Sequence, residues 1–328
     1  MRTKRIKNDG EGYYHLVSRC CRQMFMFDEG DKDMFVKMMR RVAYFSGVEV
    51  VSYCVMDNHF HILAHIHAKQ EVAEDVVLDR IRVLYGDSML FETKSRWEEF
   101  RKSGLEFKVE EELEQYRRRM GDVSIFMQCL KQRFSIWYSH HHPGTGTLWQ
   151  GRFGSTLIEG AGSALSAVSA YIDLNPVRAG IVDDPKDYRW SGYGAAIDGD
   201  ADAMLGLAHL YDENAVGSDF MEDYAADYRS KLYLKGDDVF DKAKVEEVIK
   251  NKGKLPLAVL LRCKVRYFTR GTFFGSKEFV EAEFKQHRYA FGPKRKTCAT
   301  GIGICENWDG IRLHSARRLQ KDPVIVTA

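Results

Sequence analysis

The sequence Val55-Met56-Asp57-Asn58-His59-Phe60-His61-Ile62-Leu63 organises this chain, because a turn signal and two histidines meet in it. Asp57-Asn58 is typical of a tight hairpin turn between two runs of β-forming residues. Side chains alternate between the two faces of a strand, so His59 and His61 point one way while Phe60 points the other. Two imidazoles on one face can share a metal ion, and the opposite face can pack on a core. The alternative is a pair of half-buried or exposed histidines on an edge strand.

Strand and helix patterns alternate around this hairpin. We expect strands over residues 13–19, 48–56, 59–66 and 147–158, and helices that begin at Asp31, after an Asp122 cap and at Ser163. Gly47 lies where a C-cap glycine belongs. The order β-α-β-β-α-β followed by a helix predicts an α+β fold with a ferredoxin-like antiparallel sheet. Residues 71–116 are charged and helical in pattern, with helices near 71–85 and 106–119, and we interpret them as a helical insertion.

Composition limits the class of protein. With 328 residues, 45% of them hydrophobic, the chain can form a main domain and a smaller piece. No apolar run is long enough for a transmembrane helix, and the basic start lacks the apolar segment of a secretory signal. Seven cysteines without Cys-x-x-Cys spacing favour reduced thiols in a cytoplasm.

The net charge of +2 hides a strong asymmetry. Residues 183–241 contain 15 Asp and Glu against 5 Lys and Arg, whereas residues 250–321 contain 17 Lys and Arg against 5 Asp and Glu. A basic segment of this strength favours nucleic acid as a partner, with a solvated basic face as the alternative. The change of sign predicts a domain boundary near residue 240.

A second candidate element is Tyr171-Ile172-Asp173-Leu174-Asn175-Pro176. Tyr171 and Asn175 lie one helical turn apart on the same side, and Pro176 favours the end of the helix near Asn175. A tyrosine can act as a nucleophile, and an amide oxygen suits a hard cation such as Mg²⁺ or Mn²⁺. The alternatives are a core tyrosine with a satisfied hydroxyl and an asparagine that serves as a C-cap or turn residue.

Several sequence strings in order resemble one family. The strings are Tyr14-His15 with Val17-Ser18-Arg19, Met56-Asp57-Asn58-His59-Phe60-His61, Leu148-Trp149-Gln150-Gly151-Arg152-Phe153, Tyr171-Ile172-Asp173-Leu174-Asn175-Pro176-Val177-Arg178-Ala179-Gly180 and Tyr188-Arg189-Trp190-Ser191-Gly192-Tyr193. In this order, over residues 11–194, they resemble the HUH single-tyrosine transposases, and more narrowly the REP-associated tyrosine transposases. The last string departs from the Trp-Ser-Ser that is usual in the family, outside the predicted chemistry.

The resemblance implies a site and a reaction. His59 and His61 would bind Mg²⁺ or Mn²⁺ with Asn175 as third ligand, and Tyr171 would attack a phosphate of single-stranded hairpin DNA. The product would be a 5′-phosphotyrosine and a free 3′-hydroxyl, although the residues do not identify the base that activates Tyr171. Relatives include dimers and monomers, so a homodimer is one of two expected states. The expected setting is the bacterial cytoplasm, in association with the nucleoid and without a membrane partner.

The resemblance and the charge asymmetry together divide the chain. They predict a catalytic domain over residues 1–194 with the insertion at about 69–120, an acidic connecting region over 195–240 and a basic helical accessory region over 241–328. In the last region we expect helical segments over 239–249 and 255–262 and a further helix with Ser276 as its N-cap. We expect this region to bind DNA, with a helical lid as the alternative. The DNA-binding candidates are Arg152 and Arg178 for phosphates, Trp149 and Trp190 for base stacking, and Lys294, Arg295 and Lys296 as a basic cluster.

Other histidines and other functions remain as alternatives. His65 and His67 fall at the far end of the third strand, where we expect a surface role, and His140-His141-His142 predicts a solvated loop. His15 lies either beside the site or in the core. Against the transposase stand a nucleic-acid-binding protein of the same fold without turnover and a metal phosphoesterase that attacks with water.

Overall fold

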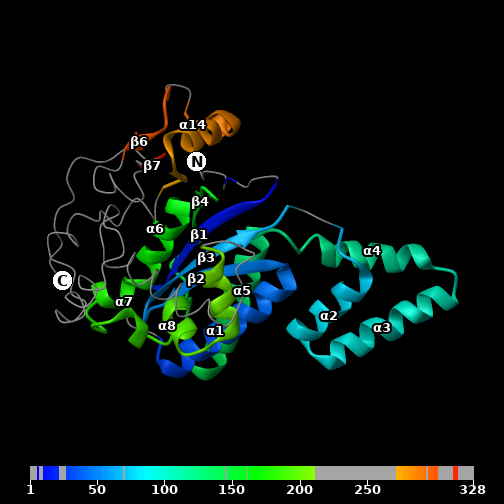
Figure 1. Cartoon of the computed structure of the whole chain (residues 1–328). Coiled ribbons are helices and arrows are strands. Elements are labelled where there is room, and N and C mark those ends of the chain that lie inside the picture. The colour runs from blue at the N-terminus through cyan, green and yellow to red at the C-terminus, as the bar shows by residue number, and fades with distance from the viewer. Residues whose placement is uncertain are drawn as a thin grey trace.

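The computed structural model describes residues 6, 10–21, 27–68, 71–144, 146–160, 162–210, 271–292, 295–301 and 313–316. Four antiparallel strands form the centre of the sheet: β1 (Gly12–Arg19), β2 (Val48–Val55), β3 (His59–Ile66) and β4 (Gly154–Ile158). They pair in the order β2-β3-β1-β4 (Figure 1). With one helix between β1 and β2 and another before β4, this order confirms the predicted ferredoxin-like fold.

Helices cover the two faces of this sheet differently. Helices α1 (Glu29–Ser46) and α5 (Val123–His141) cover the face that carries Phe60. The ring of Phe35 lies 4.5 Å from that of Phe60 and 5.0 Å from that of Phe134, which joins both helices to β3. Helix α6 (Gly162–Asp173) lies against the opposite face, where the histidines of β3 project. The alternation predicted for β3 therefore places its apolar side chains in the core and its histidines under α6.

Helix α1 shows how local sequence fixes an element. Asp28 and Asp31 form a reciprocal capping box, so the helix begins at Glu29, two residues before the predicted start. Gly47 ends it with φ of 60°, the left-handed conformation that glycine adopts without strain. The predicted C-cap is confirmed.

The insertion consists of α2 (Glu74–Tyr85), α3 (Asp87–Lys102) and α4 (Glu106–Arg117), which project away from the sheet beside α1 (Figure 1). The sequence predicted α2 and α4 but not α3. Helix α3 is largely polar and exposes Phe91, so its pattern lacks a broad apolar stripe. Its anchor is Trp97, which is 1% exposed and donates from Nε1 to Glu112 of α4 at 2.7 Å.

After α6 the chain forms α7 (Asn175–Arg178), the short 3₁₀ helix η2 (Pro185–Asp187), α8 (Gly192–Ile197) and α9 (Ala201–Ala208). The backbone of α9 lies close to the backbone of β2, since a Cβ added to Gly206 would lie 2.5 Å from the carbonyl oxygen of Val50. The first part of the predicted acidic connecting region thus packs on the sheet.

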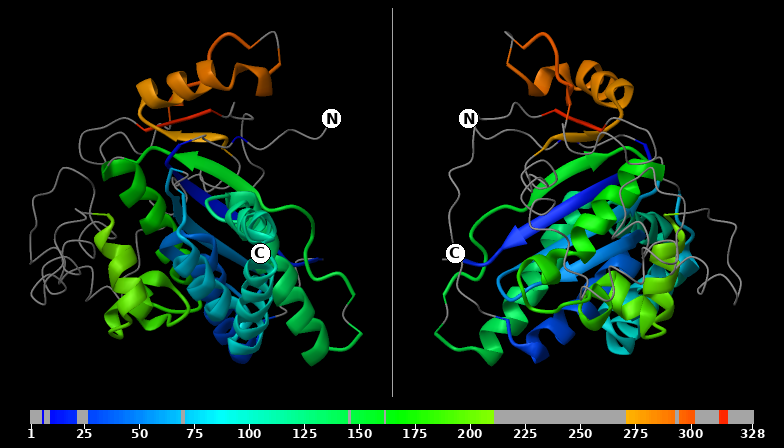
Figure 2. Two further views of the ribbon diagram at one scale, coloured as in Figure 1. Left: turned by 90° about the vertical axis from the view of Figure 1, so that its right-hand side faces the viewer. Right: turned by 60° about the vertical axis from the view of Figure 1, so that its left-hand side comes forward.

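The described part of the basic region continues the sheet. β5 (Phe273–Gly275) pairs in parallel with β4, and β7 (His314–Ser315) and β6 (Thr300–Gly301) follow. Helix α14 (Lys277–Gln286) and the 3₁₀ helix η3 (Arg288–Ala290) lie beside these strands (Figure 2). Ser276 caps α14 as predicted. The helices expected at 239–249 and 255–262 lie outside the described residues. Among the described helices, none combines the length and the apolar character needed to cross a membrane.

Candidate active site

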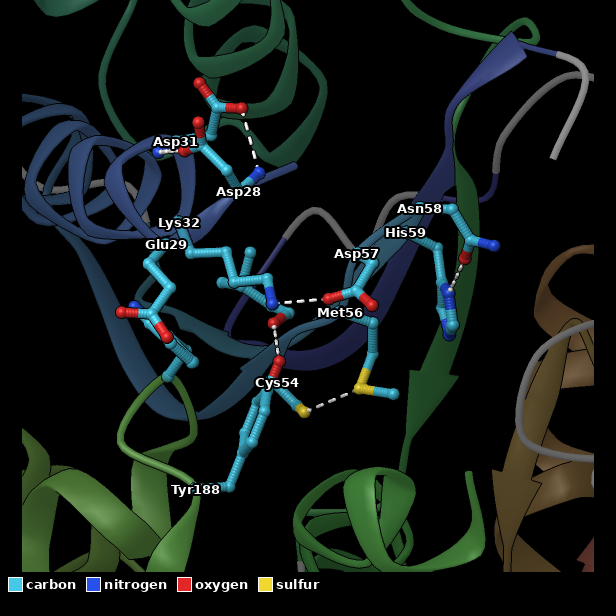
Figure 3. A network of polar contacts seen from close by, with 12 residues as sticks. Asp28, Glu29, Asp31, Lys32, Cys54, Met56, Asp57, Asn58, His59 and Tyr188 are labelled. Atoms are coloured by element: carbon cyan, nitrogen blue, oxygen red, sulfur yellow. Dashed lines mark hydrogen bonds and ion pairs between the residues drawn. The ribbon is translucent and has the colours of Figure 1, made fainter. Parts of the chain in front are cut away.

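The β2–β3 turn at Asp57-Asn58 is held from three sides. The Met56 amide donates to the His59 carbonyl at 2.8 Å and closes the turn. The Cys20 amide, just past β1, donates to the Asn58 carbonyl at 2.8 Å. From α1, Lys32 forms an ion pair with Asp57 (Figure 3). The turn that leads into the histidine strand is therefore fixed to β1 and α1.

The segment 188–190, which follows α6 in the chain, also supports the β2–β3 turn. Tyr188 donates its hydroxyl hydrogen to the Val55 carbonyl at 2.7 Å, as Figure 3 shows. The Lys32 ammonium lies 4.6 Å from the centroid of the Trp190 ring, whose Nε1 donates to Asp33 at 2.8 Å. Trp190 is half-buried between this lysine and Arg189. Its indole thus contacts the lysine that holds the turn, and base stacking by Trp190 stays a prediction.

The structure brings His59 and His61 together on the α6 side of β3, with ring centroids 5.1 Å apart. Nδ1 of His59 lies 2.6 Å from Oδ1 of Asn58, and Nδ1 of His61 lies 2.9 Å from Nε2 of His15. The Nε2 atoms are then the candidate ligand atoms of both rings. Such contacts to the second nitrogen fix the tautomer and orientation of a metal-binding histidine.

The environment keeps both rings neutral. Burial, with the nearby cations Arg19 and Arg178 next in effect, lowers the pKa of His59 to about 4. Burial also holds the pKa of His61 well below its usual value, with the neighbouring His59 and His15 next in effect. A neutral imidazole is the form that binds metal, so the pair is ready to act as ligands near neutral pH.

Tyr171 extends from α6 toward these rings. Its ring centroid lies 5.6 Å from that of His61 and 5.8 Å from that of His15. The side chain is only 5% exposed, and this burial raises the pKa of the Tyr171 phenol while Arg178 and Arg19 lower it. The Arg178 guanidinium carbon lies 4.1 Å from the Tyr171 ring centroid. The tyrosine predicted to be the nucleophile thus lies beside the histidine pair and under a cation.

Asn175 lies one turn beyond Tyr171 at the start of α7, after α6 has ended at Asp173. Its amide nitrogen donates to the carbonyls of Tyr171 and Ile172, both at 3.1 Å, and its Oδ1 accepts from Arg178 at 2.8 Å. In this conformation the amide braces the junction of α6 and α7. Direct metal binding by Asn175, as the resemblance implies, would put the ion beside the Arg178 guanidinium.

The donor set can be compared with what a hard divalent ion needs. Two neutral imidazoles with fixed orientation fit such an ion, but the adjacent charges of Arg19 and Arg178 repel it. A bound phosphate would offset that repulsion and supply oxygen ligands, which Mg²⁺ and Mn²⁺ prefer. The residues present therefore fit an ion that binds together with DNA better than an ion that binds alone.

The other DNA-binding candidates occupy different settings. Arg152 is exposed in the segment before β4, and Lys296 is exposed beyond α14. Arg295 stacks on Phe291 at 5.1 Å, and Lys294 lies outside the described residues. Trp149 is 9% exposed, and its Nε1 donates to the Ser135 hydroxyl at 2.7 Å, so its ring belongs to the core in this conformation. Base stacking by Trp149 stays a prediction that this burial does not favour.

Sequence reasoning missed two parts of the site. Arg19 lies opposite His59 in the pairing of β1 with β3. The alternation of side chains along β1 could have placed Arg19 beside His59 once that pairing was known. Asp173 is fully buried and accepts from the Ser52 hydroxyl at 3.2 Å and from the Tyr193 amide at 3.3 Å. It fixes α6 to β2 and α8, and hence fixes the position of Tyr171. No local pattern distinguishes such a buried carboxylate from a solvated helix residue.

Two expectations about the remaining histidines were wrong. His65 is not at the surface but fully buried, and it contacts Glu49 and Glu11. His142 does not belong to a simple solvated loop, because its Nε2 lies 2.8 Å from Oδ1 of the buried Asp31.

The fold and site define an α+β protein with a histidine-tyrosine centre on one sheet face. Residues 10–80 match the family model described as "Transposase IS200 like". The match includes β1, β2 and both histidines of the candidate site, and it confirms the resemblance over this segment. DNA transposition is the class of activity that this similarity indicates.

The chain was also compared with solved structures and with curated proteins. A solved structure described as "Structure of the REP associates tyrosine transposase bound to a REP hairpin" is 16% identical, with a TM-score of 0.39, and the alignment covers 66% of this chain and 93% of that chain. This likeness is too distant to argue from. None of the curated proteins matches this chain.

Proposed function

We propose that this protein is a metal-dependent DNA strand transferase that cleaves and rejoins single-stranded DNA carrying a hairpin, with Tyr171 as nucleophile. The observation that supports it most is the position of Tyr171 beside the histidine pair. The His61 ring lies 5.1 Å from that of His59 on the same strand and 5.6 Å from that of Tyr171 on α6, which is distant in sequence. A core tyrosine needs no such neighbours. The match of residues 10–80 to a transposase family supports the same assignment.

The proposed step forms a bond between the Tyr171 phenol oxygen and phosphorus while the bond from phosphorus to the 3′ oxygen breaks. The phenol loses its proton, the released 3′ oxygen gains one, and the 5′ side of the DNA stays joined to the protein. Arg178 and Arg19 would bind the phosphate and stabilise the phenolate, since both lower the pKa of Tyr171. A bound Mg²⁺ or Mn²⁺, held by His59 and His61 with Asn175 as the proposed third ligand, would polarise the phosphate.

Single-stranded DNA is the proposed substrate because the phosphate to be attacked must reach a phenol beneath α6. Arg152 and Trp190 would contact the strand on either side of the site. Residues 241–328, with the basic cluster 294–296, would act as an accessory DNA-binding region, whose described part joins the sheet through β5. Association as a homodimer and with the nucleoid forms part of the same proposal.

The test is a denaturing gel of the protein incubated with single-stranded hairpin DNA and Mg²⁺ or Mn²⁺. We expect a covalent adduct joined through the 5′ phosphate, which Tyr171→Phe abolishes. Tyr138→Phe is the matched control, because Tyr138 is also buried but lies on the other face of the sheet. Cleavage that survives Tyr171→Phe would instead indicate a phosphoesterase that attacks with water.

One observation favours a second candidate, a nucleic-acid-binding protein without turnover. Tyr171 is 5% exposed, and Asn175 is engaged by Arg178, so this conformation presents neither group to a substrate. This candidate predicts a shift of hairpin DNA under native conditions and no adduct with either metal. A trapped adduct on the wild-type protein would exclude it.

A further inference from the structure

A second group of histidines lies at the opposite end of the same sheet face. It consists of Glu11 before β1, Glu49 in β2, His65 and His67 at the end of β3, and His209 after α9; we call it the histidine-glutamate cluster. His65 is four residues beyond His61, so the cluster is about 13 Å along β3 from the candidate active site. Nothing in the proposed reaction uses it.

Glu49 is the centre of this cluster. Its Oε2 lies 2.8 Å from Nδ1 of His65 and 2.6 Å from Nε2 of His209, while its Oε1 lies 2.8 Å from Nε2 of His67. The second nitrogen of His65 lies 2.6 Å from Oε1 of Glu11. Four segments that are distant in sequence therefore direct imidazole nitrogens and carboxylate oxygens toward one another.

The local fold places these groups with little freedom. His65 is opposite Glu49 in the β2–β3 register, and it is opposite Tyr13 in β1. The Tyr13 ring stacks on His65 with centroids 4.2 Å apart and planes inclined by 5°. His65 is fully buried, so this ring is oriented before any ligand arrives. Preorganised donors of this kind distinguish a built site from a surface salt bridge.

We propose that the histidine-glutamate cluster binds a transition-metal ion, and that Zn²⁺ fits it best. The ligand atoms of Glu49, His65 and His209 all lie within 4.8 Å of one another, and we assign the ion to this triad through Nδ1 of His65. Glu11 contacts the other nitrogen of His65, so it would orient that ring and would not share the ion. An ion with bonds of about 2.1 Å needs ligands roughly 3.4 Å apart, so small side-chain rotations suffice. Imidazole with carboxylate is a Zn²⁺ donor set, whereas Mg²⁺ prefers oxygen ligands alone.

The access to the histidine-glutamate cluster and its negative charge also favour the binding of Zn²⁺. Glu49, His67 and His209 border a cavity of about 450 Å³ between β2, α1 and α9, which gives the ion an entry route and room for a water ligand. Two carboxylates lie in the cluster, in contrast to the two arginines near His59 and His61. An ion held here would fasten the end of α9 to the three central strands.

The experiment uses the full chain, free of any histidine tag and stripped with a chelator, in the background His59→Ala with His61→Ala. Zn²⁺ is titrated by isothermal calorimetry, and Co²⁺ is used as a spectroscopic probe of tetrahedral nitrogen and oxygen ligands. We expect one equivalent of Zn²⁺ in this background and a rise in Tm on binding. Removal of the first candidate site makes the result independent of the proposed function.

Adding Glu49→Gln or His209→Ala should weaken Zn²⁺ binding at least roughly 100-fold, since loss of a supporting contact alone costs 10–100-fold. His67→Ala removes the contact to Glu49 Oε1 from a side chain that is 46% exposed, so the fold should survive and Zn²⁺ binding should weaken by roughly 10–100-fold. His142→Ala is the matched control, because His142 belongs to a separate cluster with Asp28 and Asp31. Failure of the background protein to bind Zn²⁺, or binding unchanged by Glu49→Gln and His209→Ala, would overturn the proposal.

Discussion

Arg178→Ala tests the electrostatics of the candidate active site. The guanidinium donates to the Tyr171 carbonyl at 2.7 Å and to Asn175 Oδ1 at 2.8 Å. Hydrogen bonds to charged groups contribute roughly 1.5–3 kcal/mol each. The Tyr171 carbonyl keeps its bond from the Asn175 amide, at 3.1 Å, so only the bond to Asn175 Oδ1 is lost without replacement. Because Arg178 is half-buried, this one bond counts near the lower end of the range. We expect a loss of about 2 kcal/mol in the free energy of unfolding and a Tm lower by about 4–8 °C.

The effect on reaction should be larger than the effect on stability. A preorganised cation near developing charge contributes about 10²–10³ in rate, so the first-order rate of adduct formation should fall by at least about 10²-fold. Arg178 lowers the pKa of Tyr171, so its removal raises that pKa and moves the pH–rate profile toward higher pH. Arg178→Lys should be intermediate, because an ammonium keeps the charge but not the paired hydrogen bonds.

Single-turnover gels at several pH values, with the protein saturating, separate rate from DNA affinity. Arg152→Ala is the control: Arg152 is exposed, so this change should weaken DNA binding without moving the pH–rate profile. An Arg178→Ala protein that forms adduct at the wild-type rate, with an unmoved profile, would refute the assistance that we ascribe to this residue.

Three further substitutions test the elements that hold the candidate active site in place. Burial lowers the pKa of His59 from 6.5 to about 4, so the contribution of the neutral ring to the free energy of unfolding is complete above about pH 6.5 and is lost as the pH falls toward 4. His59→Gln should flatten that part of a curve of Tm against pH recorded in the presence of a chelator. Lys32→Met removes the buried partner of the β2–β3 turn carboxylate and should cost about 2 kcal/mol in urea unfolding, whereas the exposed Lys37→Met should cost under about 0.5 kcal/mol. Gly206→Ala overpacks the contact of α9 with β2 and should cost about 1–3 kcal/mol by the same measurement, while Gly292→Ala, with no atom within 4 Å of its added Cβ, should be nearly neutral.

Much of the catalytic fold follows from local rules. The alternation around Phe60 places the histidines on one face, and Asp122, Gly47 and Ser276 mark helix ends through their own capping chemistry. These signals depend only on near neighbours in the chain. For that reason they could be interpreted before any long-range contact was known.

The rest depends on contacts that no local pattern encodes. β5 has three residues and pairs with β4 across more than a hundred positions, where the Thr156 hydroxyl donates to the Gly271 carbonyl at 2.8 Å. Parity along β3 predicts that His65 shares a face with His61, but not that Tyr13 covers it and Glu49 faces it. Burial of a polar residue is a property of its partners, and those partners come from other segments.

The two ends of β3 show how neighbours determine what a histidine can do. At one end, burial and the cations Arg19 and Arg178 lower the pKa of His59, so the pair there is neutral, ready for metal but surrounded by charge that attracts phosphate. At the other end, burial would lower the pKa of His65, but its hydrogen bonds to Glu49 and Glu11 outweigh that effect and raise it. The two carboxylates at this end should attract a free divalent ion without help from DNA, and the ion must displace the proton that they stabilise on His65. At the cationic end its binding should depend on DNA, because a bound phosphate both screens the arginines and completes the ligand set.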